Sequence, residues 1–307
     1  MSWIILTNDE GASGLPISVH ALKDGKSTLD AIEAGIRFVE LDPKVRCVGF
    51  GGAPNMLGEM ELDASIMNGD TLETGAVGAV KGGVAHPISL ARQVMEKLPH
   101  VMLVGEGATR FAKECGLEFQ NILSEEARLN YQKWNSSKIG ALNVDQLSKM
   151  TLIDFSWPTK ETASCKGTVI TLIRDEMGRM AGGVSTSGWD YKYPGRLGDS
   201  PIIGAGLYVD SKYGGCACTH TGEMSIRCGT SRSVVLYMKK GATVEEACLE
   251  AKEDLGKLKV GFLGAVIIHA MDKEGEHFVT SFGEVGSASY YYWSDEKDQL
   301  IKEVVPK

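Results

Sequence analysis

The sequence predicts an α+β protein in which two packed β-sheets are sandwiched by helices. The first observation is the order of the elements: strand-like segments open and close the chain, and each half also holds a pair of helices. The second is the run TVITLI at residues 168–173, which has no polar face except its threonines, as is typical of a strand covered on both sides. With 307 residues, of which 43% are hydrophobic, the chain is long enough to bury such a core.

The first half combines short strands with well-marked helices. Ser27 is predicted to open a helix, because Asp30 follows three residues later as a variant of the capping box. Pro87 at a first-turn position predicts a second helix. The segments expected in this half are strands at 3–7, near 62 and 66, at 76–80 and at 101–104, and helices from 27, at 87–97 and at 108–114.

The second half follows a polar segment without strong periodicity, residues 116–166. A connection of about 50 residues is too long for an ordinary loop, so we interpret it as a linker with a function inside one domain spanning 1–307. A helix after Thr243 is predicted by Glu246, which completes a capping box. The other segments expected are a hairpin around 175–178, a strand at 215–220, helices at 231–239 and 244–255, and a final hairpin of 259–271 with 277–282.

Charge and composition exclude several classes of function. The chain has 32 basic and 40 acidic residues, a net charge of −8, so binding to nucleic acid or to an anionic membrane is not expected. No stretch reaches about 18 consecutive apolar residues, so no membrane span is expected either. Seven cysteines without a CxxC pair, together with an N-terminus that lacks a secretory pattern, favour a reduced, cytoplasmic protein.

Cys216, Cys218 and His220 alternate along a predicted strand, so their side chains are expected to share one face. Three soft ligands on one face could begin a zinc site. The C-x-C-x-H spacing is unusual for zinc, however, and no fourth ligand is suggested. Small buried cysteines on a strand explain the pattern more simply, and zinc binding is kept as the less favoured alternative.

Three threonines stand in a more informative order. Thr168 follows Gly167 at the start of the buried strand, Thr186 lies in STSG on the predicted return strand, and Thr219 lies in CTHTGE. Threonine is common in strands and by itself indicates nothing further. Here, though, a long polar segment ends in Gly, a Thr opens a strand, and a Gly-rich block separates the second threonine from the third.

These segments resemble the Thr-dependent N-terminal nucleophile hydrolases of the asparaginase-2, isoaspartyl peptidase and glycosylasparaginase family, and most of all its glycosylasparaginase branch. The resemblance covers nearly the whole chain and is weakest over residues 116–160. It implies a four-layer αββα sandwich. The segments that carry it are VGFGGAPNMLGEMELDASIMNGDTLETGAVG, HPISLARQVMEKLPHVMLVGEGA, KGTVITLI, GGVSTSG and KYPGRLGDSPIIGAGLYVD.

The resemblance also implies autocatalytic cleavage between Gly167 and Thr168, which would divide the chain into an α chain of 1–167 and a β chain of 168–307. The chemistry agrees with these residues. A threonine hydroxyl is a weak nucleophile until a base accepts its proton. Cleavage would free the α-amine of Thr168, whose reference pKa of about 7.7–8.0 suits a base at neutral pH.

The resemblance assigns roles to further residues. Thr186 would orient or activate Thr168. Arg196 would bind the α-carboxylate of the substrate through its planar fork, and Asp199 would pair with the α-ammonium. Thr219 and the backbone N–H that follows would form the oxyanion hole. The full set of substrate-binding positions implied in this way is Arg196, Leu197, Gly198, Asp199, Thr219, His220, Thr221 and Gly222.

Three departures from the family pattern bear on function. Ile170 and His220 stand where glycine is common, and no tryptophan lies between Trp3 and Trp134, where glycosylasparaginases carry a Trp-Pro near the glycan. Asn8 and Asp9 occupy that place, which favours small β-aspartyl amides. Strand alternation predicts that the His220 side chain points away from the face of Thr219, leaving only its backbone N–H for the oxyanion.

We therefore expect a cytoplasmic, self-processing amidohydrolase that cleaves asparagine, β-aspartyl peptides or N4-glycosylasparagine through a β-aspartyl-enzyme intermediate. No cofactor is expected, and the resemblance implies a dimer of α/β units. Two alternatives remain: an uncleaved, catalytically degenerate family member, indicated by Ile170 and His220, and the zinc-binding protein described above.

Overall fold

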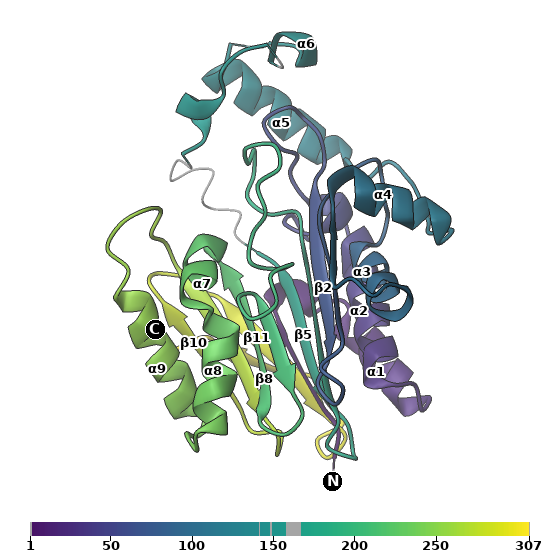
Figure 1. Cartoon of the computed structure of the whole chain (residues 1–307), viewed down its shortest axis with the longest axis vertical. Helices are drawn as coiled ribbons and strands as arrows, with labels where there is room; N and C mark the ends of the chain where they lie inside the picture. Colours follow the sequence, from purple (N-terminus) through teal and green to yellow (C-terminus); the bar gives the residue numbers. More distant parts are fainter. Residues whose placement is uncertain (1, 141, 148, 158–166, 307) are drawn as a thin grey trace.

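The computed structural model describes residues 2–140, 142–147, 149–157 and 167–306. It has four layers, with helices on the outside and two sheets packed face to face between them (Figure 1). The predicted α+β sandwich is confirmed. In the described part of the chain no helix is both long enough and apolar enough to cross a membrane.

The larger sheet has eight strands in the order β12-β11-β1-β5-β6-β2-β3-β4. All neighbours are antiparallel except β3 and β4. The strands are β1 (Ile4–Asn8), β2 (Leu62–Asn68), β3 (Thr74–Val80), β4 (Met102–Val104), β5 (Val169–Arg174), β6 (Met180–Thr186), β11 (Ser289–Ser294) and β12 (Ile301–Val304). The smaller sheet, in the order β10-β9-β8-β7, contains β7 (Leu207–Asp210), β8 (Gly214–His220), β9 (Val266–Asp272) and β10 (His277–Phe282).

Two groups of helices cover the outer faces of the sheets (Figure 1). The large sheet is covered by α1 (Leu15–Lys23), α2 (Thr28–Leu41), α3 (Pro87–Lys97) and α4 (Gly105–Glu114), and the small sheet by α7 (Gly222–Cys228), α8 (Thr230–Lys239) and α9 (Val244–Gly256). Both predicted capping boxes are present, with the side chains of Ser27 and Thr243 accepting hydrogen bonds from the N–H groups of Asp30 and Glu246.

The core forms three apolar layers, and β5 contributes to two of them. Val169 and Ile173 pack toward α2 and the other helices of the large sheet, whereas Ile170 and Leu172 pack between the sheets. All four side chains are fully buried. This confirms the predicted strand covered on both sides, although β5 runs from Val169 to Arg174 and begins one residue after Thr168. The third layer lies between the small sheet and α7 to α9.

The segment 116–166, predicted as a linker, contains regular secondary structure. It holds α5 (Glu125–Lys138), α6 (Val144–Leu147) and a 3₁₀ turn at Ile153–Phe155, and Pro158 with the rest of the segment to 166 lies outside the described residues. Within α5 only Ala127 and Asn135 are buried, so the helix has almost no apolar stripe to reveal it in the sequence. Its Trp134 instead stacks on Tyr191, with ring centroids 4.5 Å apart.

Other elements were also missed or misplaced. The sequence pattern predicts no element for the segments of α1, α7, β7, β11 or β12. Strand β9 begins at Val266 rather than 259. Its hairpin with β10 is not the last element, because β11 follows and pairs with β1, and β12 pairs with β11. The SYYYWS sequence of β11 is rich in aromatic residues that favour strands, so this strand could have been predicted from the sequence.

We predict that Gly75→Ala destabilises the protein by about 1–3 kcal/mol, because overpacking a buried contact forces the backbone to move. A Cβ at Gly75 of β3 would lie 1.9 Å from the carbonyl oxygen of Ala91 in α3. The matched control is Gly107→Ala in α4, where a Cβ has nothing within 4 Å and where alanine favours the helix by about 1 kcal/mol. Urea unfolding measures both variants, and equal changes would contradict the close approach of α3.

Candidate active site

Strand register brings two of the three predicted threonines, Thr168 and Thr186, to the same end of the large sheet. Thr7 of β1 pairs with Thr171 of β5, and Val169 pairs with Ser185 of β6. The end of β1, the start of β5 and the end of β6 therefore lie side by side. The helix α5 lies at this same end of the molecule (Figure 1).

Thr168 lies directly before β5 and is 5% exposed. Its carbonyl oxygen accepts a hydrogen bond of 2.6 Å from Nδ2 of Asn8, and Oδ1 of Asn8 accepts one of 3.2 Å from the N–H of Ile170. One amide side chain thus holds the backbone just after the predicted nucleophile. The sequence places Asn8 near the site only because it stands where relatives carry a Trp-Pro, and it indicates no role for this side chain.

Thr186 and Gly167, both predicted from the sequence to be site residues, are in contact in the structure. The Thr186 hydroxyl lies 3.1 Å from the Gly167 carbonyl oxygen and 3.3 Å from the Cys47 carbonyl oxygen, and it accepts a 3.0 Å bond from the N–H of Gly188. The Gly167 carbonyl is the group that Thr168 would attack in self-cleavage. A hydroxyl donor already on this oxygen is suited to stabilise negative charge there.

At the end of β8, the prediction for His220 is wrong. Its side chain does not point away from Thr219: Nδ1 of His220 lies 3.0 Å from Oγ1 of Thr219. The reason is a backbone φ of +82° at His220, which breaks the strand alternation on which the prediction depended. This left-handed conformation favours glycine and costs a residue with a Cβ about 1–2 kcal/mol.

Arg196 and Asp199 lie on the loop between β6 and β7. The Arg196 guanidinium makes a two-point ion pair with Glu223 of α7, with Nε and Nη2 at 3.0 and 2.9 Å from the two carboxylate oxygens, and it stacks over the Trp189 ring at 4.4 Å. Glu223 received no role from the sequence, although it ends the CTHTGE segment. This ion pair fixes the plane of the guanidinium. The third nitrogen, Nη1, does not contact Glu223.

Asp199 is buried, and its Oδ2 has no hydrogen-bond partner among the described residues. Burial raises the pKa of Asp199 to about 6, and the nearby Arg196 opposes this shift. A Cβ at Gly222 would lie 2.8 Å from Oδ1 of Asp199, so glycine is needed there for the carboxyl to fit. Asp199 therefore offers an unused acceptor for a cationic group.

The remaining predicted positions have different surroundings. Leu197 packs against β3, where a Cβ at Gly78 would lie 2.4 Å from its Cδ2. Gly198 lies beside the guanidinium, since a Cβ there would be 3.1 Å from Nη1 of Arg196. Thr221 is fully buried, and its hydroxyl has no hydrogen-bond partner among the described residues.

Buried charges anchor the 188–196 loop to the start of β2. The Lys192 ammonium is buried, donates a 3.0 Å bond to the Glu61 carbonyl oxygen and lies 3.8 Å from Oδ2 of Asp63. Burial lowers the pKa of Lys192, although Asp63 opposes this effect. Glu61 in turn accepts bonds of 3.0 and 3.1 Å from the N–H of Gly195. No sequence motif marked these groups as part of the site.

The cysteines proposed for zinc face the helices. Cys216 and Cys218 are fully buried in the layer between the small sheet and α8 and α9, together with Cys248. Burial raises the pKa of the Cys218 thiol well above its usual range, which disfavours the thiolate that binds zinc. Among the residues that the structure describes, no group of three or more His, Cys, Asp or Glu side chains could hold a metal ion.

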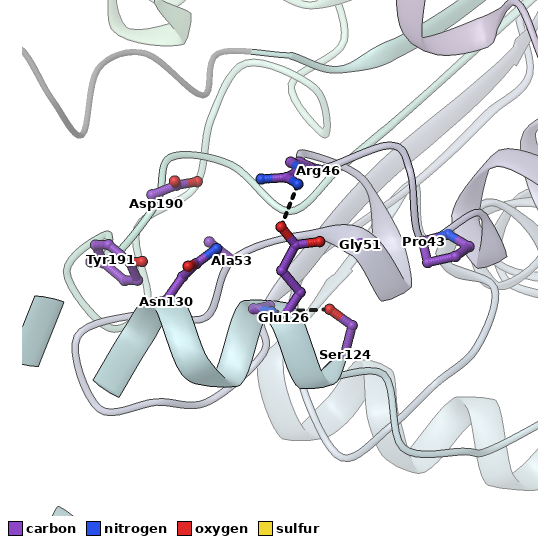
Figure 2. A pocket seen from close by; sticks show the side chains of 10 residues that line it. Pro43, Arg46, Gly51, Ala53, Ser124, Glu126, Asn130, Asp190 and Tyr191 are labelled. Atoms are coloured by element: carbon purple, nitrogen blue, oxygen red, sulfur yellow. Dashed lines mark hydrogen bonds and ion pairs between the residues drawn. The ribbon is translucent and has the colours of Figure 1, made fainter. Parts of the chain in front are cut away.

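Two pockets lie at this end of the molecule. Figure 2 shows one between α5 and the 43–53 segment, where Arg46 and Glu126 form an ion pair across it; none of the predicted site residues lines it. The other has aromatic walls formed by Trp134, Trp157, Trp189 and Tyr191. Because Trp189 also stacks on Arg196, this second pocket adjoins the predicted substrate-binding group.

Comparison with known proteins agrees with this architecture. A family model described as Asparaginase matches residues 13–301. The N(4)-(beta-N-acetylglucosaminyl)-L-asparaginase of Elizabethkingia miricola is 38% identical over 278 residues, which cover 86% of this chain and 74% of the relative. The isoaspartyl peptidase/L-asparaginase of Mus musculus is 36% identical over 258 residues, which cover 83% of this chain and 72% of the relative. The isoaspartyl peptidase of Salmonella typhimurium is 37% identical over 230 residues, which cover 74% of this chain and 70% of the relative.

The family model spans nearly the whole chain, and the relatives match in most of their own length. The fold is the layered sandwich expected for this family. The chain therefore belongs to the asparaginase family of N-terminal nucleophile hydrolases, and it is an amidohydrolase.

Proposed function

We propose that the chain cleaves itself between Gly167 and Thr168 and then hydrolyses the side-chain amide of small β-aspartyl compounds, namely asparagine and β-aspartyl peptides. The observation that carries the proposal is the pair of contacts around the nucleophile. Thr186 contacts the Gly167 carbonyl, and Asn8 holds the Thr168 carbonyl. The two carbonyls on either side of the Thr168 nitrogen are thus both oriented by side chains.

In this proposal the Thr168 hydroxyl first attacks the Gly167 carbonyl carbon. The peptide C–N bond breaks, the nitrogen gains a proton, and an ester joins Gly167 to Oγ1 of Thr168. This step frees the α-amine of Thr168. Water then hydrolyses the ester, which releases the Gly167 carboxylate and regenerates the Thr168 hydroxyl. That amine then serves as the base for the hydroxyl of its own residue.

The mature site would bind its substrate by charge. The α-ammonium of the substrate would pair with the buried Asp199 carboxylate, and the α-carboxylate with Arg196 through Nη1, since Glu223 already holds Nε and Nη2. Thr168 would attack the β-carbonyl, release the amine and form a β-aspartyl ester. Thr219 and the N–H of His220 would stabilise the oxyanion, and water would then release aspartate.

Glycosylasparagine is a second candidate substrate. The sequence has no tryptophan between Trp3 and Trp134, but Trp134, Trp157, Trp189 and Tyr191 form an aromatic pocket beside Arg196. Aromatic faces of this kind suit the apolar face of a sugar ring. One relative is also named for activity on an N-acetylglucosaminyl asparagine.

We further propose a dimer of α/β units in a reducing, cytoplasmic compartment. The dimer rests on the family resemblance. The compartment rests on the cysteines, since among the described residues Cys115, Cys216, Cys218, Cys228 and Cys248 form no disulfide.

Purified wild-type protein should mature into two fragments, the smaller beginning at Thr168. Thr168→Ala should stay intact at 33.0 kDa, because the attacking hydroxyl is gone. Thr186→Val should slow maturation by about 10²–10³, the usual effect of losing one oxyanion donor. Intact mass and N-terminal sequencing measure the result. A wild-type chain that stays uncleaved after long incubation would support the degenerate alternative instead.

Substrate choice should depend on both α-groups. Hydrolysis of asparagine and of a β-aspartyl dipeptide should lose most of its kcat/KM when the α-amine is acetylated. It should also fall as pH drops below about 6, because Asp199 becomes neutral there and no longer binds the ammonium. Arg196→Lys should be strongly impaired, since a point charge does not replace the fork. Faster turnover of N4-(N-acetylglucosaminyl)asparagine than of either small substrate would favour the second candidate.

His220 can be tested with a matched pair of variants. His220→Ala and His220→Gly both remove the imidazole that contacts Thr219, but only glycine relieves the positive φ. In matured protein both should lose less kcat than Thr219→Val, expected at about 10²–10³, because the backbone N–H of residue 220 remains. The glycine variant should be more stable than the alanine variant by about 1 kcal/mol in thermal unfolding. If His220→Ala were more damaging than Thr219→Val, the side chain of His220 would itself be required.

A further inference from the structure

Gly167 lies against two side chains that fill the space where its own would point. A Cβ at this position would be 2.2 Å from Sγ of Cys47 and 2.3 Å from Oε1 of Glu10. Both distances are far inside van der Waals contact, so a side chain at 167 would have to displace one of these groups. The Glu10 carboxyl therefore lies directly against the residue that carries the carbonyl attacked in self-cleavage.

The same carboxyl is linked to the other side of that peptide bond. Glu10 belongs to the 3₁₀ turn Asp9–Gly11 that follows β1. Its Oε2 accepts a 2.6 Å bond from Nδ2 of Asn8, the same nitrogen that donates to the Thr168 carbonyl oxygen, and the Cys47 thiol lies 3.8 Å from its Oε1. Among the described residues no basic side chain forms an ion pair with Glu10.

The surroundings of Glu10 make its proton exchangeable near neutral pH. Burial raises the pKa of Glu10 to about 7, and the neighbouring carboxylate of Asp9 raises it further, against the opposing effects of a backbone hydrogen bond and of Cys47. Asp9 and Cys47 are the titratable groups that face it in the described part of the chain. The group is thus partly charged at the pH where a base and an acid are both needed.

We propose that Glu10 is the proton carrier of self-cleavage. Its carboxylate takes the proton of the Thr168 hydroxyl as Oγ1 bonds to the Gly167 carbonyl carbon, and the resulting carboxylic acid gives that proton to the Thr168 nitrogen as the C–N bond breaks. Thr186 stabilises the oxyanion during this exchange. The inference rests on the proposed self-cleavage, and it also explains why residue 167 must lack a side chain.

The test is the rate of maturation between pH 5 and 9, followed by intact mass on freshly purified precursor. In the wild type the rate should rise with pH through a midpoint near 7, because the carboxylate form is the base. Glu10→Gln should mature at least about 100-fold more slowly and lose this midpoint, since an amide cannot accept the proton. Glu10→Asp should retain partial activity with a displaced midpoint.

Asp9→Asn is the matched control, since it changes the adjacent carboxylate on the same turn. It should mature at a rate close to that of the wild type with a lower midpoint, because removing the Asp9 charge lowers the pKa of Glu10. Thermal unfolding of each precursor establishes that the variants fold.

The proposal is overturned if Glu10→Gln matures at the wild-type rate or keeps the wild-type midpoint, or if the Asp9→Asn midpoint does not move. A wild-type chain that never matures would overturn the self-cleavage itself, so the two failures are distinguishable. If Glu10→Gln fails to fold, the midpoints of the wild type and of Asp9→Asn decide the question.

Discussion

The arrangement of the candidate site depends on the burial of β5 on both faces. The strand is paired with β1 on one side and β6 on the other, and apolar layers cover it above and below. Such a strand cannot shift by one residue without moving every side chain to the opposite layer. Thr168, the residue directly before this strand, is therefore fixed relative to Asn8 at the end of β1 and Thr186 at the end of β6.

Around this fixed point the molecule keeps polar groups that a purely structural core would avoid. Oδ2 of Asp199 and the hydroxyl of Thr221 are buried without a hydrogen-bond partner among the described residues, and Glu10 has a raised pKa and no ion pair there. A buried polar atom left without a partner costs about 1–3 kcal/mol. These costs gather at one end of the sandwich, where substrate charges and a migrating proton would supply the missing partners.

The two departures from the family's glycine pattern have different physical meanings. Ile170 is fully buried between the sheets, and its side chain adds apolar area to that layer. It needs no special backbone conformation and is compatible with the strand. His220 keeps the left-handed conformation that glycine would adopt freely, and so it carries strain while placing an imidazole on the hydroxyl of Thr219. Isoleucine at 170 therefore affects only the packing between the sheets, whereas histidine at 220 adds an imidazole at the predicted oxyanion position.

The sequence alone determined those features that arise from local pattern. Capping residues marked α2 and α9, the apolar run at 168–173 marked the central strand, and the motifs around Thr168, Thr186 and Thr219 indicated the family. Surface helix α5 could not be predicted from hydrophobic periodicity, because it packs through stacked aromatic rings such as Trp134 on Tyr191 and has no periodic apolar stripe. Only the tertiary structure placed Glu10, Cys47 and Glu223 at the site and gave Asn8 its contact with the Thr168 carbonyl. These residues are far from their partners in sequence, and their roles come from the register of β1 against β5 and the approach of α7 to the 188–196 loop, which no local pattern encodes.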